Sequence, residues 1–263
     1  MTVFALDPLD LAALLCSRVC HDVISPVGAI INGLEVLDEE NDAEMRGFAL
    51  DLIKKSAEQA SARLQFCRLA FGAAGSAGAS IDTGDAEKVA RGLFGGERTQ
   101  LAWNVPCLLM PKNKVKLILN LCLIAAAAIP RGGIIEVTLS SEEPARISVI
   151  AKGTNAKLAG QLPGLLTGTP DQHPSSPQDI QAYYAWLVAK AANMVLTVMA
   201  EADRVSIEAE PLIVEPAAVS EHGIGGMSDL AAQPDKNVSR ETLLSPISPT
   251  SPTGSDFCDF RGV

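Results

Sequence analysis

The stretch SRVCHDVISPVGAIINGLEVL, residues 17–37, carries an apolar repeat that predicts a long helix packed in a bundle. When the repeat is extended back to residue 9, its members recur at alternating intervals of 4 and 3. This is the heptad spacing of a helix whose one face meets other helices. We therefore expect one helix from residue 8 to about residue 40, with two cysteines on its buried face. The repeat consists of Leu9, Ala13, Cys16, Cys20, Val23, Val27, Ile30, Leu34 and Leu37.

His21 lies on the flank of this repeat, beside Cys20, because successive helical residues are rotated by about 100°. Asp22 follows it directly, and Pro26 comes five residues later, where its ring and missing N–H should bend the helix. An imidazole of ordinary pKa, about 6.5, is largely neutral near pH 7 and keeps a lone pair for attack on phosphorus. His21 is therefore the candidate catalytic nucleophile.

Three neighbours complete the candidate catalytic set. Asp22 resembles the acidic residue that follows the histidine in sensor histidine kinases, and this resemblance implies that it hydrogen-bonds the second ring nitrogen of His21. Adjacent residues face each other only on a distorted helix, and the alternative is a solvated charge. Arg18, one turn earlier, is placed to meet a phosphoryl oxygen, and its alternative is an ordinary surface ion pair. Ser25 lies one turn after His21.

The face below His21 continues as a low, apolar stripe formed by Ile24, Gly28 and Ile31. We expect a helix of a partner protein to pack on this stripe. The alternative is that Ile24 and Ile31 belong to a dimer core at a slightly different helix rotation.

A second helix is expected from Asp42, as its N-terminal cap, to about residue 71. The turn before it is short, so residues 1–71 should form an antiparallel hairpin. A single hairpin cannot bury the apolar repeat on both sides. Pairing of two copies into a four-helix bundle solves this problem, and we therefore expect a homodimer.

Residues 72–84, GAAGSAGASIDTG, read as a flexible linker, and residues 85–216 as a second domain. There we expect helices over 85–94, 112–129 and, capped by Asp179, 180–193, with residues 152–177 irregular. Strands are expected over 98–105, 134–140, 145–151, 195–200 and 204–209. The fold class is α+β: the hairpin, then an α/β sandwich with a mainly antiparallel sheet. Residues 217–263, rich in Gly, Ser, Pro and Thr, are expected to be disordered.

The amino-acid composition limits the classes of binding partner that we expect. A net charge of −10 and a pI near 4.8 argue against nucleic acid or an anionic membrane surface. The apolar run over 117–129 is too short for the roughly 20 residues of a membrane span, and no signal peptide is apparent, so we expect a cytoplasmic protein. The 6 cysteines form no C-x-x-C pair, which favours reduced, core-type thiols and no metal site.

The pattern His21-Asp22, Pro26, Ala29-Ile30 and Leu34 resembles the H-box of sensor histidine kinases, and the second half resembles their ATP-binding domain. The positions that those kinases use for ATP differ here. Ile124 stands where they carry a magnesium-binding Asn, and Ala151 where they carry the adenine-recognising Asp. Their glycine-rich lid is also missing. Asn120, from the same motif as Ile124, is expected to be no more than a residue left from ancestry.

The motif S-R-V-C-H-D-x-x-x-P-x-x-A-I resembles the ChpT-type histidine phosphotransferases of the alphaproteobacterial cell-cycle phosphorelay. The resemblance implies a dimer that accepts a phosphoryl group on His21 from the receiver domain of a hybrid histidine kinase. It would pass the group to response regulators such as CtrA and CpdR, without ATP. It implies no cofactor of its own, with Mg²⁺ in the partner receiver. Two alternatives stay open: an ATP-dependent sensor kinase, and a non-catalytic dimeric adaptor that binds receivers.

Overall fold

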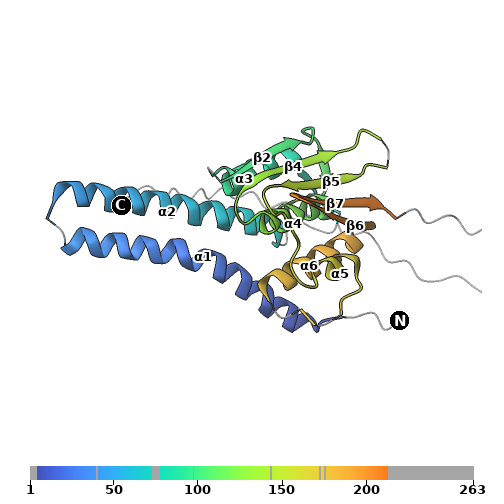
Figure 1. Ribbon diagram of the computed structural model, residues 1–263, viewed down its shortest axis with the longest axis horizontal. Helices are drawn as coiled ribbons and strands as arrows, with labels where there is room; N and C mark the ends of the chain where they lie inside the picture. The colour runs from blue at the N-terminus through green and yellow to red at the C-terminus, as the bar shows by residue number, and fades with distance from the viewer. Residues whose placement is uncertain are drawn as a thin grey trace, which may run out of the picture. The chain divides into compact units, whose positions relative to one another are not determined.

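A computed structural model describes residues 5–39, 41–72, 78–96, 98–142, 144–171, 173–174 and 176–212. Helices α1 (Pro8–Glu39) and α2 (Ala43–Ala70) form an antiparallel hairpin that projects from an α/β domain (Figure 1). These bounds agree with the two predicted helices. The predicted disordered segment, 217–263, lies outside the described residues.

The predicted cap of α2 is present. The carboxylate of Asp42 accepts a hydrogen bond from the Met45 backbone N–H at 3.0 Å. It satisfies one of the backbone donors that the first turn of a helix leaves unpaired. The short turn thus places the second helix antiparallel to the first, as expected.

Helix α1 continues through Pro26 and curves along its length (Figure 1). Its two buried residues are Pro26 and Gly33, which are 7 apart. Gly33 permits close approach of α2, since a Cβ there would lie 2.6 Å from Ile53 Cγ1. The face that α1 turns to its own α2 is therefore not the predicted repeat. The expected burial of Cys16 and Cys20 is wrong for this single chain, because that face points outward and both are exposed.

The segment expected to be a linker contains regular structure at its C-terminal end. Strand β1 (Ser80–Asp82) pairs antiparallel with β3 (Leu109–Pro111). Helix α3 (Thr83–Phe94) begins two residues before its predicted start, because the Asp82 side chain accepts from the Gly84 N–H at 2.7 Å and caps it. The preceding residues 73–77 lie outside the described part of the chain.

The main sheet has five strands in the order β2-β4-β5-β7-β6. Strands β4, β5, β7 and β6 pair antiparallel in turn, as predicted, while β2 pairs parallel with β4. The parallel pair needs a crossover, which α4 supplies. The strands are β2 (Thr99–Asn104), β4 (Gly133–Leu139), β5 (Ile147–Lys152), β6 (Met194–Glu201) and β7 (Arg204–Pro211).

Helix α4 (Lys112–Ala128) is buried along most of its length, and packs against the sheet and against α6 (Pro177–Ala191). Helix α6 is capped by Ser176 and not by Asp179. The Ser176 hydroxyl accepts from the Asp179 N–H, and the Asp179 carboxylate accepts from the Ser176 N–H. This reciprocal capping box starts the helix three residues earlier than predicted.

Helix α5 (Leu162–Thr167) lies in the segment expected to be irregular. Six residues are too few to show a helical repeat, so the pattern gave no signal for it. Its buried residues are Leu162, Leu165 and Leu166, and it packs on α6. Gly168, with φ +77°, ends it in the left-handed conformation that glycine adopts easily.

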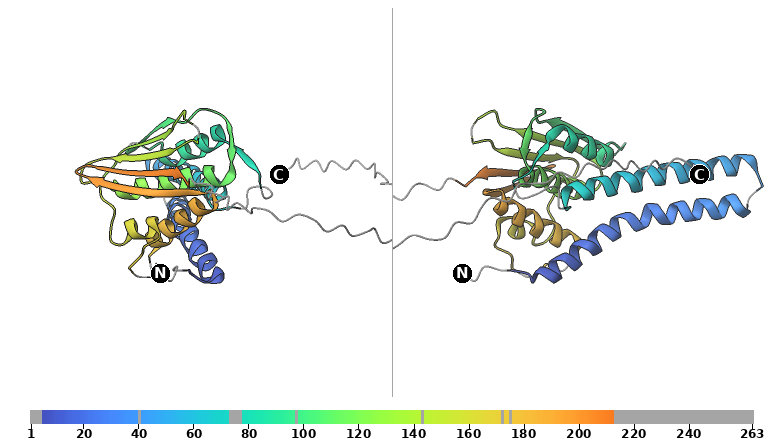
Figure 2. Two further views of the ribbon diagram at one scale, coloured as in Figure 1. Left: turned by 90° about the vertical axis from the view of Figure 1, so that its right-hand side faces the viewer. Right: turned by 180° about the vertical axis from the view of Figure 1, so that it is seen from behind.

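Both ends of the hairpin are attached to the α/β domain. At the start of α1, the Leu6 N–H donates to the Tyr183 hydroxyl of α6 at 3.1 Å, near where α1 passes α6 in Figure 2. At the end of α2, the Ala70 carbonyl accepts from Asn120 Nδ2 of α4 at 3.1 Å. The hairpin therefore meets the second domain through two of its helices.

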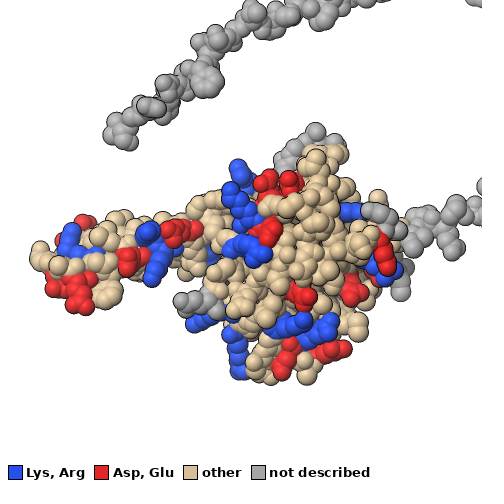
Figure 3. Space-filling view, turned by 90° about the horizontal axis from the view of Figure 1, so that it is seen from above, with Lys and Arg blue, Asp and Glu red and all other residues tan. Residues whose placement is uncertain are grey.

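The face seen in Figure 3 carries Lys and Arg interspersed with Asp and Glu, among broad areas of other residues. It offers no extended basic patch. Among the described helices, α1 is the one long and apolar enough to cross a membrane by length and composition alone. A helix packed in a bundle passes the same test. Since α1 packs along α2, its length and hydropathy do not distinguish a membrane span from a bundle helix.

Candidate functional site

His21 stands on the surface of α1, with 72% of its side chain exposed. Its Nδ1 lies 3.4 Å from Asp22 Oδ1, a long hydrogen bond. The two adjacent side chains therefore meet, which an ideal helix does not favour. If Nδ1 carries the ring proton toward the carboxylate, the lone pair lies on Nε2. In that tautomer Nε2 is the ring nitrogen that is free to act as a nucleophile.

Asp22 has a second partner on the same helix. Arg18 Nε donates to Asp22 Oδ2 at 3.1 Å, and the two side chains are only 16% and 19% exposed. One oxygen of the acid thus faces the histidine and the other faces the arginine. Arg18 forms the ion pair that was the alternative to a contact with phosphate.

The other predicted site residues lie on the open surface of α1. Ile24 is 69% exposed and Ile31 51% exposed. Gly28 lies between them, and a Cβ added there would meet nothing within 4 Å. Ser25 is also exposed. The stripe below His21 is thus apolar, low and accessible.

The positions that correspond to nucleotide contacts in kinases are buried in the core. Ile124 is 2% exposed and Ala151 is fully buried. The aliphatic side chains at these two positions offer neither a metal ligand nor a hydrogen-bonding group.

Asn120 has a role that sequence reasoning missed. It is fully buried, and its Nδ2 donates to the Lys116 carbonyl at 2.7 Å as well as to Ala70. The Ala70 carbonyl is one of those that a helix C-terminus leaves unpaired. The expectation that Asn120 is merely left from ancestry is wrong, because its partner lies 50 residues away and no local pattern reveals it.

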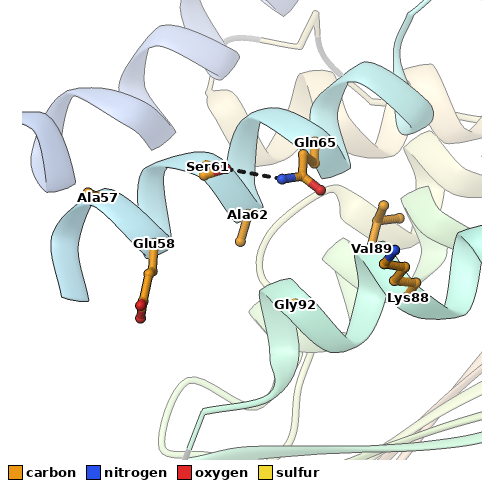
Figure 4. A pocket seen from close by; sticks show the side chains of 8 residues that line it. All are labelled: Ala57, Glu58, Ser61, Ala62, Gln65, Lys88, Val89 and Gly92. Carbon is orange, nitrogen blue, oxygen red and sulfur yellow. Dashed lines mark hydrogen bonds between the residues drawn. The ribbon is translucent and has the colours of Figure 1, made fainter. Parts of the chain in front are cut away.

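A groove of about 520 Å³ separates α2 from α3 (Figure 4). Its walls carry small residues such as Ala57, Ala62 and Gly92, and Gln65 Nε2 donates to Ser61 Oγ at 3.0 Å along the wall formed by α2 (Figure 4). None of its lining residues belongs to the His21 set. Within the described ranges, no group of three or more His, Cys, Asp or Glu is placed to hold a metal ion.

The thiols differ in their surroundings. Cys122 is buried, and burial raises the pKa of its thiol to about 12. Cys16, Cys20 and Cys107 are exposed in the single chain, so the expectation of core-type thiols is wrong for Cys107, whereas Cys16 and Cys20 lie on the face that the predicted dimer would cover. All the cysteines that the structure describes are free.

Comparisons with known proteins show the family to which the chain is related. Residues 83–204 match the family described as histidine phosphotransferase C-terminal domain. The protein phosphotransferase ChpT of Brucella abortus (strain 2308) is 48% identical over 206 residues, which are 78% of this chain and 97% of that protein. A solved structure titled as a bacterial phosphotransferase is similar with a TM-score of 0.72 and 44% identity, covering 79% of this chain and 99% of that one.

A helical hairpin that presents a histidine beside an acid, followed by an α/β domain that matches the histidine phosphotransferase C-terminal domain, defines a histidine phosphotransferase of a phosphorelay. The chain belongs to the ChpT-type histidine phosphotransferases.

Proposed function

We propose that this phosphotransferase accepts a phosphoryl group on His21 from the receiver domain of a hybrid histidine kinase and passes it to response-regulator aspartates. The observation that carries the proposal is the exposed His21 whose Nδ1 faces Asp22 at 3.4 Å. It is an imidazole open to a large partner and oriented by an acid.

The chemistry needs no nucleotide. A phosphoaspartate is an acyl phosphate, so attack by Nε2 on phosphorus forms the N–P bond and releases the aspartate carboxylate. The charge that develops on the imidazole is balanced by Asp22, which accepts the Nδ1 hydrogen bond. Catalysis is then mainly positioning, with Mg²⁺ in the partner receiver stabilising the phosphoryl oxygens. Return transfer follows the same steps in reverse.

Specificity for the partner is assigned to the stripe Ile24, Gly28 and Ile31, which is exposed beside the histidine. Donor and acceptor would pack one helix on this stripe in turn. The proposed acceptors are response regulators of the CtrA and CpdR type, in the cytoplasm.

A second copy of the chain is the proposed cover of the remaining apolar surface of the hairpin. Val27 and Leu34 of the predicted repeat are exposed in the single chain, and so are Phe48 and Leu52 of α2. Large apolar side chains in such number on one hairpin favour association. A dimer would also bury Cys16 and Cys20, as the repeat predicts.

Incubation of the purified protein with a phosphorylated receiver domain and Mg²⁺ tests the proposal. Acid-labile, base-stable label on the protein supports a phosphohistidine relay. Binding of the receiver without label would favour the adaptor, and label from radioactive ATP alone would favour the kinase. The kinase alternative finds no support at the two nucleotide positions, since Ile124 and Ala151 are buried.

A further inference from the structure

A cavity of about 300 Å³ lies where the hairpin meets the α/β domain, and it includes the acid that contacts His21. Arg18, Asp22, Arg63 and Cys67 line it from the hairpin. Because the remaining lining is apolar, the three charged groups share a small space that is partly shielded from water. The apolar lining residues are Phe66, Leu93, Phe94, Leu123, Ala126 and Ala127.

Arg63, on α2, has a donor that is not in use. Its Nε is buried and has no hydrogen-bond partner within the described structure. A buried N–H without a hydrogen-bond acceptor lowers the stability of the fold, which indicates that the group serves a function. The anionic group that lines the same cavity is Asp22, whose oxygens face His21 and Arg18.

The pKa of the Cys67 thiol depends on the same three charged groups. Burial, and then the charge of Asp22, raise the pKa of this thiol, whereas Arg18 and Arg63 lower it. Interactions between charges weaken with distance. Both arginines and the acid therefore lie close to one sulfur atom. This electrostatic relationship agrees with the lining of the cavity.

We propose that Arg63 is a positioning residue for the transfer reaction, which keeps the Asp22 carboxylate directed at Nδ1 of His21. The inference rests on the proposed function and adds a residue from the second helix to it. Arg18 and Arg63 bring two positive charges to the cavity and Asp22 one negative charge, so both arginines attract the carboxylate. A carboxylate held against Nδ1 keeps the ring proton on that nitrogen and so leaves the lone pair on Nε2.

The α/β domain has a part in this arrangement. Phe94 of α3 packs edge-to-face on Phe66 of α2, with ring centroids 5.7 Å apart, and Ala126 and Ala127 of α4 close the other side. The domain thus supplies the apolar wall that keeps water from screening Arg63 and Asp22. Although its nucleotide positions are buried, the α/β domain thus supports the reaction at His21.

Substitution of Arg63 tests the proposal in the full-length chain. Arg63→Gln should slow transfer from a phosphorylated receiver on the order of 2- to 10-fold, the range for loss of one partly shielded charge interaction. Arg63→Lys keeps the charge and should restore most of the rate. Arg91→Gln is the control, because Arg91 pairs with Glu87 on α3 and does not line the cavity. Equal slowing by Gln and Lys would overturn the proposal.

Two further measurements separate positioning from mere stability. In an Asp22→Asn background, Arg63→Gln should not slow transfer any further. If it slowed transfer by the same factor as in the wild type, Arg63 would not act through Asp22. In ¹⁵N NMR spectra, the fraction of His21 protonated on Nδ1 should fall in Arg63→Gln and recover in Arg63→Lys. A tautomer ratio that does not respond would contradict the assignment.

The proposal can also be tested without changing Arg63, by a substitution in the apolar wall of the cavity. Ala127 is exposed at the rim of the cavity, so Ala127→Glu should fold and should compete with Asp22 for the arginines. It should slow transfer more than Ala127→Gln, which has the same size without charge. Equal effects would count against the proposal. If the wild type itself took no label, the proposed function would fail, and the tautomer ratio would still decide the role of Arg63.

Discussion

Asn120 Oδ1 accepts a hydrogen bond from Gln181 Nε2 at 2.6 Å, and both side chains are buried. The same asparagine donates to Ala70 at the end of α2. Three helices, α2, α4 and α6, thus meet through one side chain. A residue from a motif that resembles a nucleotide-binding one here joins the hairpin to the α/β domain.

Asn120→Ala should destabilise the protein by about 2–4 kcal/mol, because it leaves the Ala70 carbonyl and the Gln181 amide buried without partners. The matched control is Asn113→Ala at the start of the same helix, where a single bond to the Ala191 carbonyl is lost. That change should cost about 1 kcal/mol. Urea unfolding measures both. Equal destabilisation would show that the buried network adds nothing.

Substitution of alanine for each of two glycines in α1 should change the stability of the protein in opposite directions. Gly28→Ala should stabilise the helix by up to about 1 kcal/mol, since a Cβ there is unobstructed. Gly33→Ala should destabilise the hairpin by about 1–3 kcal/mol, because the new Cβ lies 2.6 Å from Ile53 Cγ1. Thermal unfolding of the two variants gives the comparison. Stabilisation by Gly33→Ala would mean that the helices are not so closely packed.

The protein should have the mass of a dimer in light scattering at micromolar concentration. Leu34→Glu should give a monomer, because it places a charge in the proposed bundle core. Leu109→Glu serves as the control, since Leu109 is equally apolar, 72% exposed and located on β3, away from the hairpin. A monomeric wild type would refute the proposed dimer.

Titration with Mg-ATP should release no heat. Ile124 and Ala151 are in the core and have no group that binds metal or adenine. Opening a site there would expose buried apolar surface, which is unfavourable. A micromolar dissociation constant in the calorimeter would revive the kinase alternative.

His21→Gln should abolish phosphoryl acceptance and leave receiver binding and stability nearly unchanged, within about 0.5 kcal/mol, because the side chain is 72% exposed. His173→Gln should accept label like the wild type. Asp22→Asn should slow transfer without stopping it, at most by the 10²- to 10⁴-fold that is typical of proton-handling groups. The readout is acid-labile label after incubation with a phosphorylated receiver. Undiminished label on His21→Gln would disprove the assignment.

Much of this architecture follows from local sequence patterns. The heptad repeat predicts the length of α1, Asp42 predicts the start of α2, and alternation predicts the five strands of the main sheet within a few residues. The pair His21-Asp22 before Pro26 marks the site. Each of these signals is carried by residues close together in the chain, and their physical cause, helical or strand periodicity and capping, acts over the same short range.

Only the tertiary structure decided which surfaces meet. The sequence indicated an apolar face on α1, but Pro26 and Gly33, not that face, contact α2, because a glycine without a Cβ permits the closest approach. Asn120 and Arg63 likewise looked ordinary in sequence. Their roles depend on groups that the fold brings together from distant positions, such as Gln181, 61 residues from Asn120. No local pattern contains the partner of a long-range contact, so burial and charge had to be determined in three dimensions.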